Sequence, residues 1–399
     1  MQAGVQSKQS CDVVIAGGAV MGASAAYWLT RMHPGLRVIV VERDPTYARS
    51  ATALSVASIR QQFSNPVNVK ISQYGFEFIN DFQKSLGVEV GIPSLGLKEN
   101  GYLFLTGSVE GAAAMREVAA VQRAHGAATE LLSPQQLAAR FSWMALEDVT
   151  LGSFGPEREG WFDNMGLLNG FRLAAKAQGA RFVTDCVVGL LRDGARVSGL
   201  KLASGAAISA PVVIGAMGVR AAELLAMAGE VWPVEPRKRT VFVIDAPNAR
   251  HPDAPLLIDH TGYYLRPEHN QWITATVPEI DPTVSADDFE PRHAEFEEII
   301  WPLLYARAPG FDAVKVVRFW VGHYDYNTLD QNAILGPHPR LPGLYMMSGF
   351  SGHGLQQAPA VGRGLAEIVL TGSYQSLDLS ELGIERVLAN RPFLEKEIV

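Results

Sequence analysis

Glycines grouped near the N-terminus, followed by an acid, are the residues whose types and spacing most clearly suggest chemistry. Gly17, Gly18 and Gly22 follow an apolar run over residues 12–16 and precede helix-forming residues. Glycine lets the backbone approach a pyrophosphate closely, and the N–H groups that open a helix attract anions. Glu42 ends a second apolar run, about 20 residues after Gly22, where a carboxylate can accept hydrogen bonds from ribose hydroxyls. The pattern predicts a dinucleotide site.

The glycine spacing departs from the usual fingerprint at one position. Ala19 stands where the middle glycine is expected, and its methyl group crowds the approach of a phosphate. Gly18 beside it offers some relief. An ordinary strand–turn–helix connection is the alternative interpretation. The apolar strands on both sides and the acid at the end favour the dinucleotide interpretation, and a pyridine-nucleotide dehydrogenase is one protein class that would use such a site.

Size and composition limit the scaffold that positions these residues. The 399 residues are enough for two domains, and 48% hydrophobic with 19% charged residues is typical of a compact globular protein. The net charge of −7 argues against a nucleic-acid surface, and no apolar run is long enough to span a membrane. The first ten residues lack the apolar core of a secretory signal, so we expect a cytoplasmic protein.

The two cysteines, Cys11 and Cys186, are far apart in the sequence and stand in apolar, strand-like contexts. We expect both side chains to be buried for structural reasons. Two cysteines form neither a disulfide framework nor a zinc site of their own, so no metal is predicted.

Secondary-structure signals alternate along the chain in a way that indicates a discontinuous domain. The strands and helices expected from apolar spacing and turn residues are 37–42, 65–87, 102–105, 165–178, 180–188, 211–218, 240–244, 271–276, 291–307 and 355–371. The residue pattern changes near residue 231, where prolines begin to interrupt short predicted strands. We predict an α/β (α+β overall), Rossmann-like nucleotide domain of residues 1–88, 155–230 and 326–399. An inserted antiparallel-sheet domain takes residues 89–154 and 231–325.

A glycine-rich block near the C-terminus, YMMSGFSGHGLQQAP at residues 345–359, carries a resemblance to a known family. Together with the N-terminal unit, the block resembles the D-amino-acid oxidase and sarcosine oxidase superfamily of FAD-dependent amine oxidoreductases. The resemblance covers residues 11–372. Segments 58–64 (SIRQQFS) and 324–332 (YDYNTLDQN) are typical of the branch of the mitochondrial FAD-dependent oxidoreductase domain-containing protein.

The resemblance implies noncovalent FAD along the first βαβ unit, with its ring at the interface with the substrate domain. The residues it implies as cofactor contacts are Gly17, Gly18, Ala19, Val20, Met21, Gly22, Glu42, Arg43, Ser50, Ala51, Ser55, Val187, Ala216, Met217, Gly218, Gly349, Gly352, His353, Gly354, Leu355 and Gln356. Arg43 either covers the adenosine or is plain surface. The helix beginning near Gly354 would point its N-terminus at the flavin pyrimidine, where reduced flavin carries negative charge.

Two arginines are candidates for binding a substrate carboxylate. Arg60 lies between apolar neighbours, and the matching position in sarcosine oxidases carries a carboxylate-binding arginine. A structural ion pair is the alternative role for Arg60. Arg266 belongs to the inserted domain, where strand alternation places it on the same face as Tyr264 and opposite Tyr263. The two tyrosines either pack within the sheet or shape a substrate pocket.

Two histidines fall in the expected flavin region. His353, inside the glycine-rich block, is expected to contact the ring, with a purely structural hydrogen bond as the alternative. His323 occupies what looks like the position at which monomeric sarcosine oxidases tether their flavin through a cysteine. A histidyl–flavin bond is therefore the alternative to the noncovalent FAD that we expect.

The resulting hypothesis is FAD-dependent oxidation of a primary or secondary amino acid of the N-substituted glycine type. A hydride would pass to flavin N5, and the imine would then hydrolyse; no acid or base is required at the carbon. Arg60, with Arg266 as a second anchor, would hold the carboxylate, while Tyr263, Tyr264 and His323 would shape the pocket. The alternative is an FAD-bearing scaffold or assembly factor with little turnover.

The sequence does not determine which electron acceptor completes the reaction. Sarcosine oxidases carry a lysine shortly after the flavin histidine, where this chain has Gln356 and Gln357. They also use a lysine on an inserted-domain strand for oxygen activation, and residues 271–276 contain none. Oxygen or another electron acceptor would complete the reaction.

Overall fold

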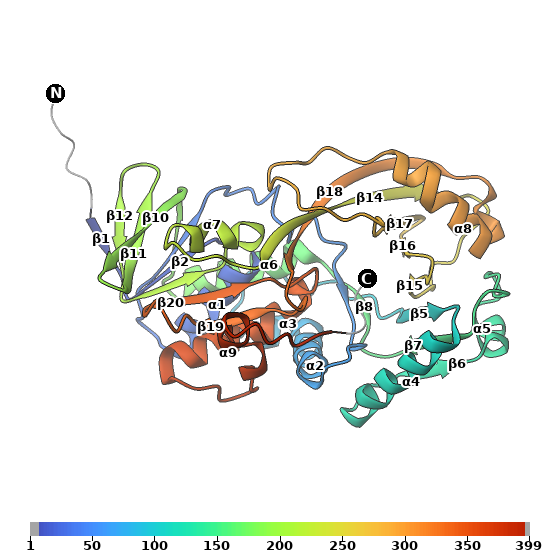
Figure 1. The fold of residues 1–399 in the computed structure, drawn as a ribbon, viewed down its shortest axis with the longest axis horizontal. Coiled ribbons are helices and arrows are strands. Elements are labelled where there is room, and N and C mark those ends of the chain that lie inside the picture. Colours follow the sequence, from blue (N-terminus) through green and yellow to red (C-terminus); the bar gives the residue numbers. More distant parts are fainter. Residues whose placement is uncertain (1–7, 396–399) are drawn as a thin grey trace.

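The computed structural model describes residues 8–395, which fold around four β-sheets (Figure 1). A six-stranded sheet runs in the order β19-β20-β13-β2-β3-β9. Its strands are β2 (Val13–Ala16), β3 (Val38–Glu42), β9 (Arg181–Thr184), β13 (Val212–Gly215), β19 (Ile334–Pro337) and β20 (Leu344–Ser348). Neighbouring strands are parallel except β19 and β20. This parallel core, built from separate parts of the chain, confirms the predicted Rossmann-like fold.

Strand alternation explains why this sheet is covered on both faces. In β2, Val13 and Ile15 pack into a core with the helices, whereas Val14 and Ala16 face a four-stranded sheet on the other side. The helices of the first layer are α1 (Val20–Met32), α2 (Pro66–Asn80), α3 (Phe82–Leu86), α6 (Asn164–Ala177) and α9 (Gly354–Thr371). The opposite layer contains β1 (Lys8–Ser10), β10 (Val187–Asp193), β11 (Arg196–Leu202), β12 (Ala207–Ser209), α7 (Ala221–Ala226) and α10 (Ile384–Leu388).

An eight-stranded sheet forms the other half of the molecule, in the order β18-β14-β17-β16-β15-β5-β7-β6 (Figure 1). Its strands are β5 (Tyr102–Thr106), β6 (Glu130–Leu132), β7 (Leu151–Gly155), β14 (Val234–Asp245), β15 (Leu256–Ile258), β16 (Tyr263–Glu268), β17 (Gln271–Thr276) and β18 (Lys315–Asn327). All pairs are antiparallel except β5 with β15. The strands come from segments 102–155 and 234–327, which agrees with the predicted insertion; the exact domain boundaries stay a prediction.

The two faces of this sheet have different roles. One face packs a core that includes Leu103, Phe242 and Trp272 against α5 (Pro134–Arg140) and α8 (Trp301–Arg307). Alternate residues, such as Tyr102 and Tyr264, point to the inner face and toward the six-stranded half. The remaining α-helix is α4 (Val109–Ala124), and β4 (Ser58–Ile59) pairs with β8 (Gly160–Trp161) in a small sheet.

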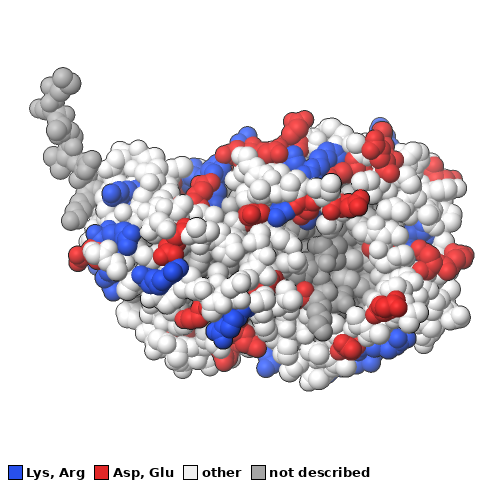
Figure 2. Space-filling model, in the orientation of Figure 1, with Lys and Arg blue, Asp and Glu red and all other residues white. Residues whose placement is uncertain are grey.

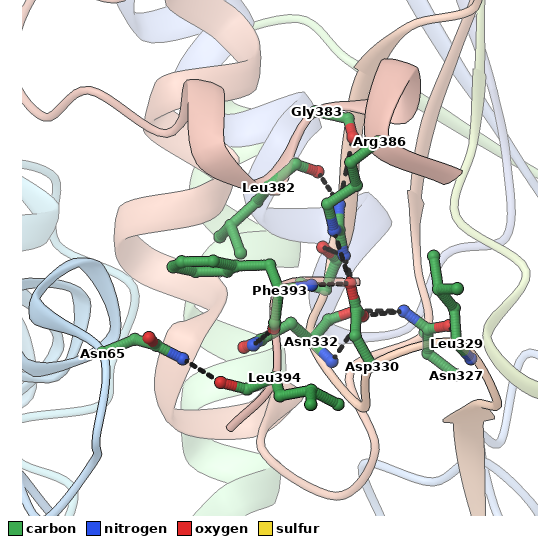
Figure 3. Close-up of polar contacts among 12 residues, drawn as sticks. Asn65, Asn327, Leu329, Asp330, Asn332, Leu382, Gly383, Arg386, Phe393 and Leu394 are labelled. Atoms are coloured by element: carbon green, nitrogen blue, oxygen red, sulfur yellow. Dashed lines mark hydrogen bonds and ion pairs between the residues drawn. The ribbon is translucent and has the colours of Figure 1, made fainter. Parts of the chain in front are cut away.

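The end of the described chain is fastened by a buried carboxylate (Figure 3). Asp330, in the loop after β18, accepts a hydrogen bond from Arg386 Nε at 2.7 Å and one from the Phe393 N–H at 2.9 Å. Asn65, just before α2, donates to the Leu394 carbonyl at 2.8 Å. The segment up to residue 395 is thereby tied to both ends of the nucleotide-binding domain.

Two expectations need correction. Cys11 is buried as predicted, but the prediction for Cys186 is wrong, because its side chain is exposed. Residues 180–188 form not one strand but two: β9 belongs to the six-stranded sheet and β10 to the four-stranded sheet. Cys186 lies in the connection between them, where nothing packs over it.

Charged side chains of both signs are interspersed over the face shown in Figure 2, without a continuous basic field. Within residues 8–395, none of the helices is long and apolar enough to cross a bilayer.

Candidate active site

A cavity of about 430 Å³ is lined by residues of both halves of the molecule. The predicted cofactor residues that line it are Gly17, Ala19, Val20, Met21, Glu42, Arg43, Ser50, Ala51, Ser55, Val187, Ala216, Met217, Gly218, Gly352, His353, Gly354, Leu355 and Gln356. Arg60, Tyr264 and His323 line it as well, whereas Gly18, Gly22, Gly349 and Arg266 do not. Segments that are far apart in the sequence therefore converge on one space.

Close packing explains the glycines of the first loop. Gly17 has φ +96°, and a Cβ there would lie 2.3 Å from the carbonyl oxygen of Ala216 on the neighbouring strand. A Cβ at Gly22 would lie 1.9 Å from the Gly17 carbonyl oxygen. Gly349 has φ +71° in the turn after β20. Gly22 and Gly349 therefore allow the backbone conformation around the cavity and do not line the cavity themselves.

The N-terminus of α1 lies at the end of this loop, on the cavity wall. Ala19 has no side chain that could cap it, and the Val20 N–H donates to Thr52 Oγ1 at 3.3 Å. Exposed N–H groups at a helix N-terminus stabilise phosphate. Glu42 is held nearby, because Oε2 accepts from the Gly18 N–H at 2.7 Å and Oε1 from the Asp44 N–H at 2.8 Å. Each oxygen keeps a further lone pair for a ribose hydroxyl.

Arg43 takes part in a charge cluster on the cavity wall. Its guanidinium lies 3.4 Å from Asp287 Oδ1, and the guanidinium of Arg220 lies 2.6 Å from Asp287 Oδ2. Arg220 also pairs with Glu223 at 2.5 Å. These contacts tie the end of β3 and the start of α7 to the segment that follows β17.

His353 stands directly before α9 and carries a defined tautomer. Its Nε2 lies 3.0 Å from Nη2 of Arg60, and a guanidinium can only donate, so Nε2 accepts and the ring proton is on Nδ1. Burial, and then the charge of Arg60, lower the pKa of His353 to about 3. The imidazole is therefore neutral at physiological pH.

Arg60 is a buried cation on the cavity wall, only 4% exposed. Its guanidinium donates to the Gln62 carbonyl and to His353 and lies 4.0 Å from the Phe63 ring centroid. Its backbone N–H donates to Oε1 of Gln356 at 2.7 Å. The side chain is thus fixed in one orientation beside the N-terminus of α9.

His323 is 5% exposed and lines the same cavity from β18. The ring of Phe289 packs against it edge-on at 4.6 Å. Burial lowers the pKa of His323, so the ring is neutral, and Nε2 has no hydrogen-bond partner among residues 8–395. An orphaned buried nitrogen on a cavity wall is a group that a ligand can satisfy.

Arg266 is placed differently from Arg60. Its guanidinium pairs with Glu268 and donates to the Pro267 and Val56 carbonyls, both at 3.1 Å. These contacts join β16 to the segment that precedes β4. A carboxylate-binding role for Arg266 stays a prediction without support from the cavity lining.

Several residues of the site were not singled out from the sequence. Tyr102 and Tyr324 line the cavity together with Tyr264, and Arg239 reaches it from β14. Strand alternation in β14 was a usable signal for Arg239, because Val241 lines the same face. No sequence pattern distinguished Tyr102 and Tyr324 from core residues.

Two buried carboxyl groups were missed as well. Glu159 accepts from the Gln61 N–H and from Gln62 Nε2, each at 2.8 Å, and burial raises its pKa to about 7. Asp325 lines the cavity and accepts from the Phe350 N–H at 3.2 Å; burial raises its pKa to about 6. Isolated acids in the sequence carry no mark of such burial.

Comparisons with known proteins distinguish among the dinucleotide interpretations. The family described as DAO, FAD dependent oxidoreductase, matches residues 12–368. The chain belongs to this family. Over 98% of its length it is 39% identical to FAD-dependent oxidoreductase domain-containing protein 1 of Xenopus laevis, of which the match covers 85%. It is also 23% identical to monomeric sarcosine oxidase of Bacillus sp. (strain NS-129), over 97% of this chain and 98% of that protein.

Among solved structures, L-proline dehydrogenase from P. horikoshii superimposes on this FAD-dependent oxidoreductase with a TM-score of 0.85 and 26% sequence identity. The match covers 97% of this chain and all of the other. The family match favours FAD over the pyridine nucleotide that the glycine loop alone left open.

The residues present fit FAD. The positive-φ Gly17, the α1 N-terminus and the anchored carboxylate of Glu42 suit a pyrophosphate and ribose. The N-terminus of α9 and the unpartnered Nε2 of His323 lie on the same cavity, where a flavin ring could meet them.

Proposed function

We propose that this oxidoreductase oxidises a primary or secondary amino acid of the N-substituted glycine type. The observation that carries the proposal is Arg60, a buried and rigidly held guanidinium on the wall of the cavity that fits FAD. A guanidinium matches a carboxylate with two parallel hydrogen bonds, and its cost of burial is offset when such an anion binds. In an α-amino acid, the carboxylate is attached to the carbon whose C–H bond would be oxidised.

Positioning is the main contribution of this chain to the reaction. FAD, when bound, supplies the acceptor for the electron pair of the substrate C–H bond. Arg60 fixes the carboxylate, and the hydroxyl-bearing rings of Tyr102, Tyr264 and Tyr324 line the space around the rest of the substrate. Neutral His353 and His323 add no positive charge that would disfavour an approaching amine. Orientation of the substrate by these groups supplies the catalysis.

The lining also bears on the electron acceptor. Within residues 8–395, no lysine lines the cavity. This supports a dehydrogenase that passes electrons to an acceptor other than oxygen, although oxygen is retained as a candidate in the test below.

Anaerobic mixing tests the proposal. The FAD-loaded protein is mixed with a panel of N-alkyl glycines, other secondary amino acids and D-amino acids, and the visible flavin band is followed. We expect bleaching by at least one of them, and then recovery of the band on adding oxygen or a quinone. A flavin that keeps its colour with every amino acid would contradict the proposal and favour a scaffold role.

A further inference from the structure

The cavity presents a second buried guanidinium that the proposed reaction does not use. Arg239 lies on β14, is 6% exposed and lines the cavity. It belongs to the eight-stranded half, whereas Arg60 belongs to the other half. Two cations, one from each half of the molecule, therefore line one cavity.

The hydrogen bonds of Arg239 leave one edge of its guanidinium unused. Nη1 and Nη2 each donate to one carboxylate oxygen of Asp281 at 2.8 Å, and Nη1 also donates to the Lys238 carbonyl at 3.0 Å. Nε is buried without a hydrogen-bond partner among residues 8–395. Nε and Nη2 together form the second two-donor edge of a guanidinium, which matches a carboxylate as well as the first edge does.

Asp281 does not remove the demand for an anion at this edge. It is not among the residues that line the cavity, whereas Arg239 is. Leaving a buried N–H of a charged group without a hydrogen-bond acceptor costs free energy. An anion that enters the cavity can satisfy them.

The surroundings of the two arginines are aromatic and share one cluster of hydroxyl groups. Burial raises the pKa of Tyr102, Tyr264 and Tyr324. The charge of Arg60 opposes this rise at Tyr102, and the charge of Arg239 opposes it at Tyr264 and Tyr324. Both guanidiniums therefore lie near these tyrosines, and the guanidinium of Arg239 lies over the Tyr324 ring, 5.1 Å from its centroid.

The charges of the lining favour an anion here. Of the residues in the eight-stranded sheet that line the cavity, Arg239 and Asp325 carry charges, and the Asp325 carboxylate already accepts from the Phe350 N–H. A substrate with a single carboxylate, placed on Arg60, leaves the second edge of the Arg239 guanidinium unmatched.

We propose that the substrate is a dicarboxylic amine, such as an N-carboxyalkyl amino acid, with its α-carboxylate on Arg60 and its second carboxylate on Arg239. The inference rests on the proposed function, because it assigns the substrate class of the same site. Arg239 is then the residue that determines specificity for the second carboxylate.

Equilibrium binding of unreactive ligands tests this assignment apart from turnover. The FAD-loaded protein is titrated with oxydiacetate and with 3-(carboxymethoxy)propanoate, each compared with its monoamide. Each pair differs mainly by one charge, and the ethers contain no amine to oxidise. Binding is followed through the visible flavin spectrum and by calorimetry. We expect at least one diacid to bind about tenfold or more tightly than its monoamide, as for one charge-assisted hydrogen bond.

Variants test whether Arg239 is the residue responsible for the preference for diacids over monoamides. Arg239→Met should abolish the diacid preference and leave monoamide binding within about threefold, since a surviving contact to Arg60 is common to both ligands. The matched control is Arg237→Met, which removes an arginine of the same strand that also lies over a tyrosine ring, at 5.2 Å from Tyr326, but does not line the cavity. It should keep the preference. Because Arg239→Met leaves a carboxylate without its cation, Asp281→Asn is a second variant, and it should strengthen diacid binding.

The outcomes separate the two proposals. Equal affinity for diacids and monoamides, or a preference that persists in Arg239→Met and is unaffected by Asp281→Asn, overturns the dicarboxylate assignment alone. Failure of both ligand types to bind, together with no amino acid that bleaches the flavin, overturns the proposed function as well.

Discussion

Replacing Arg60 by methionine removes the cation that we place on the substrate carboxylate. The substitution keeps an unbranched side chain of similar length beside Phe63 but deletes every N–H donor. The backbone N–H of residue 60, which donates to Gln356 Oε1 at 2.7 Å, is retained, so the local chain path is expected to survive. The effect should therefore fall on carboxylate binding.

The magnitude follows from the surroundings of Arg60. Removing one partner of a buried, hydrogen-bonded charge pair costs about 2–5 kcal/mol, and each 1.4 kcal/mol is about tenfold in affinity. The guanidinium already donates to Gln62 and His353, so only part of its donors is available to the substrate. We expect the lower part of the range, an affinity loss of about 30- to 300-fold.

Arg60→Lys should show an intermediate loss of about tenfold. The ammonium group keeps the charge but cannot form the planar two-donor fork that matches a carboxylate. In both variants burial remains the larger cause of the lowered pKa of His353, so the imidazole should stay neutral.

The assay is a spectroscopic titration of the oxidised, FAD-loaded protein with a carboxylate ligand, alongside kcat/KM for an amino acid that bleaches the flavin. FAD content and the thermal midpoint are measured for each variant to separate binding from folding. Arg237→Met serves as the control, because Arg237 does not line the cavity. An affinity in Arg60→Met within about threefold of the unmodified protein would refute the assignment of Arg60.

Four further predictions follow from the cavity and its supports. Glu42→Gln should weaken FAD binding about tenfold, as measured by flavin release on dilution, because a neutral amide accepts more weakly from ribose hydroxyls than a carboxylate. Gly22→Ala should lower the thermal midpoint and the FAD content together, because its Cβ would lie 1.9 Å from the Gly17 carbonyl oxygen; an unchanged midpoint would contradict that packing. The pKa of Glu159, raised by burial to about 7 from an ordinary 4.5, means that the protonated carboxyl stabilises the folded state below pH 4.5. That contribution, about 3 kcal/mol, is lost as the pH rises to 7, and Glu159→Gln should flatten this part of a denaturation-against-pH curve. Acid precipitation should release all the flavin into the supernatant, whereas flavin that stays with the pellet would indicate a bond to His323.

The sequence predicted the nucleotide-binding half well because its signals are local. A glycine cluster between an apolar strand and a helix indicates a tight turn, and α9 begins at Gly354, inside the glycine-rich block of residues 345–359. Strand alternation likewise separated Tyr263, in the outer core, from Tyr264, on the cavity. The comparisons and the structure confirmed the predicted family, fold class and cofactor.

The rest depended on contacts that the sequence does not encode locally. Arg60 and Arg266 look alike as isolated arginines, yet one lines the cavity and the other pairs with Glu268. Arg239 reaches the cavity only because β14 pairs with both β17 and β18 in a fixed register. Burial of Glu159 results from three-dimensional packing beside Gln62. Which charged residues meet across two halves is therefore visible only in the structure.

A crystal structure of the FAD-loaded protein with a bound, unreactive carboxylate ligand tests the central claim most directly. The account predicts the isoalloxazine ring against the N-terminus of α9, the pyrophosphate over the loop that contains Gly17, and a ligand carboxylate on the guanidinium of Arg60. A flavin bound elsewhere, or a ligand carboxylate without contact to Arg60, would contradict it.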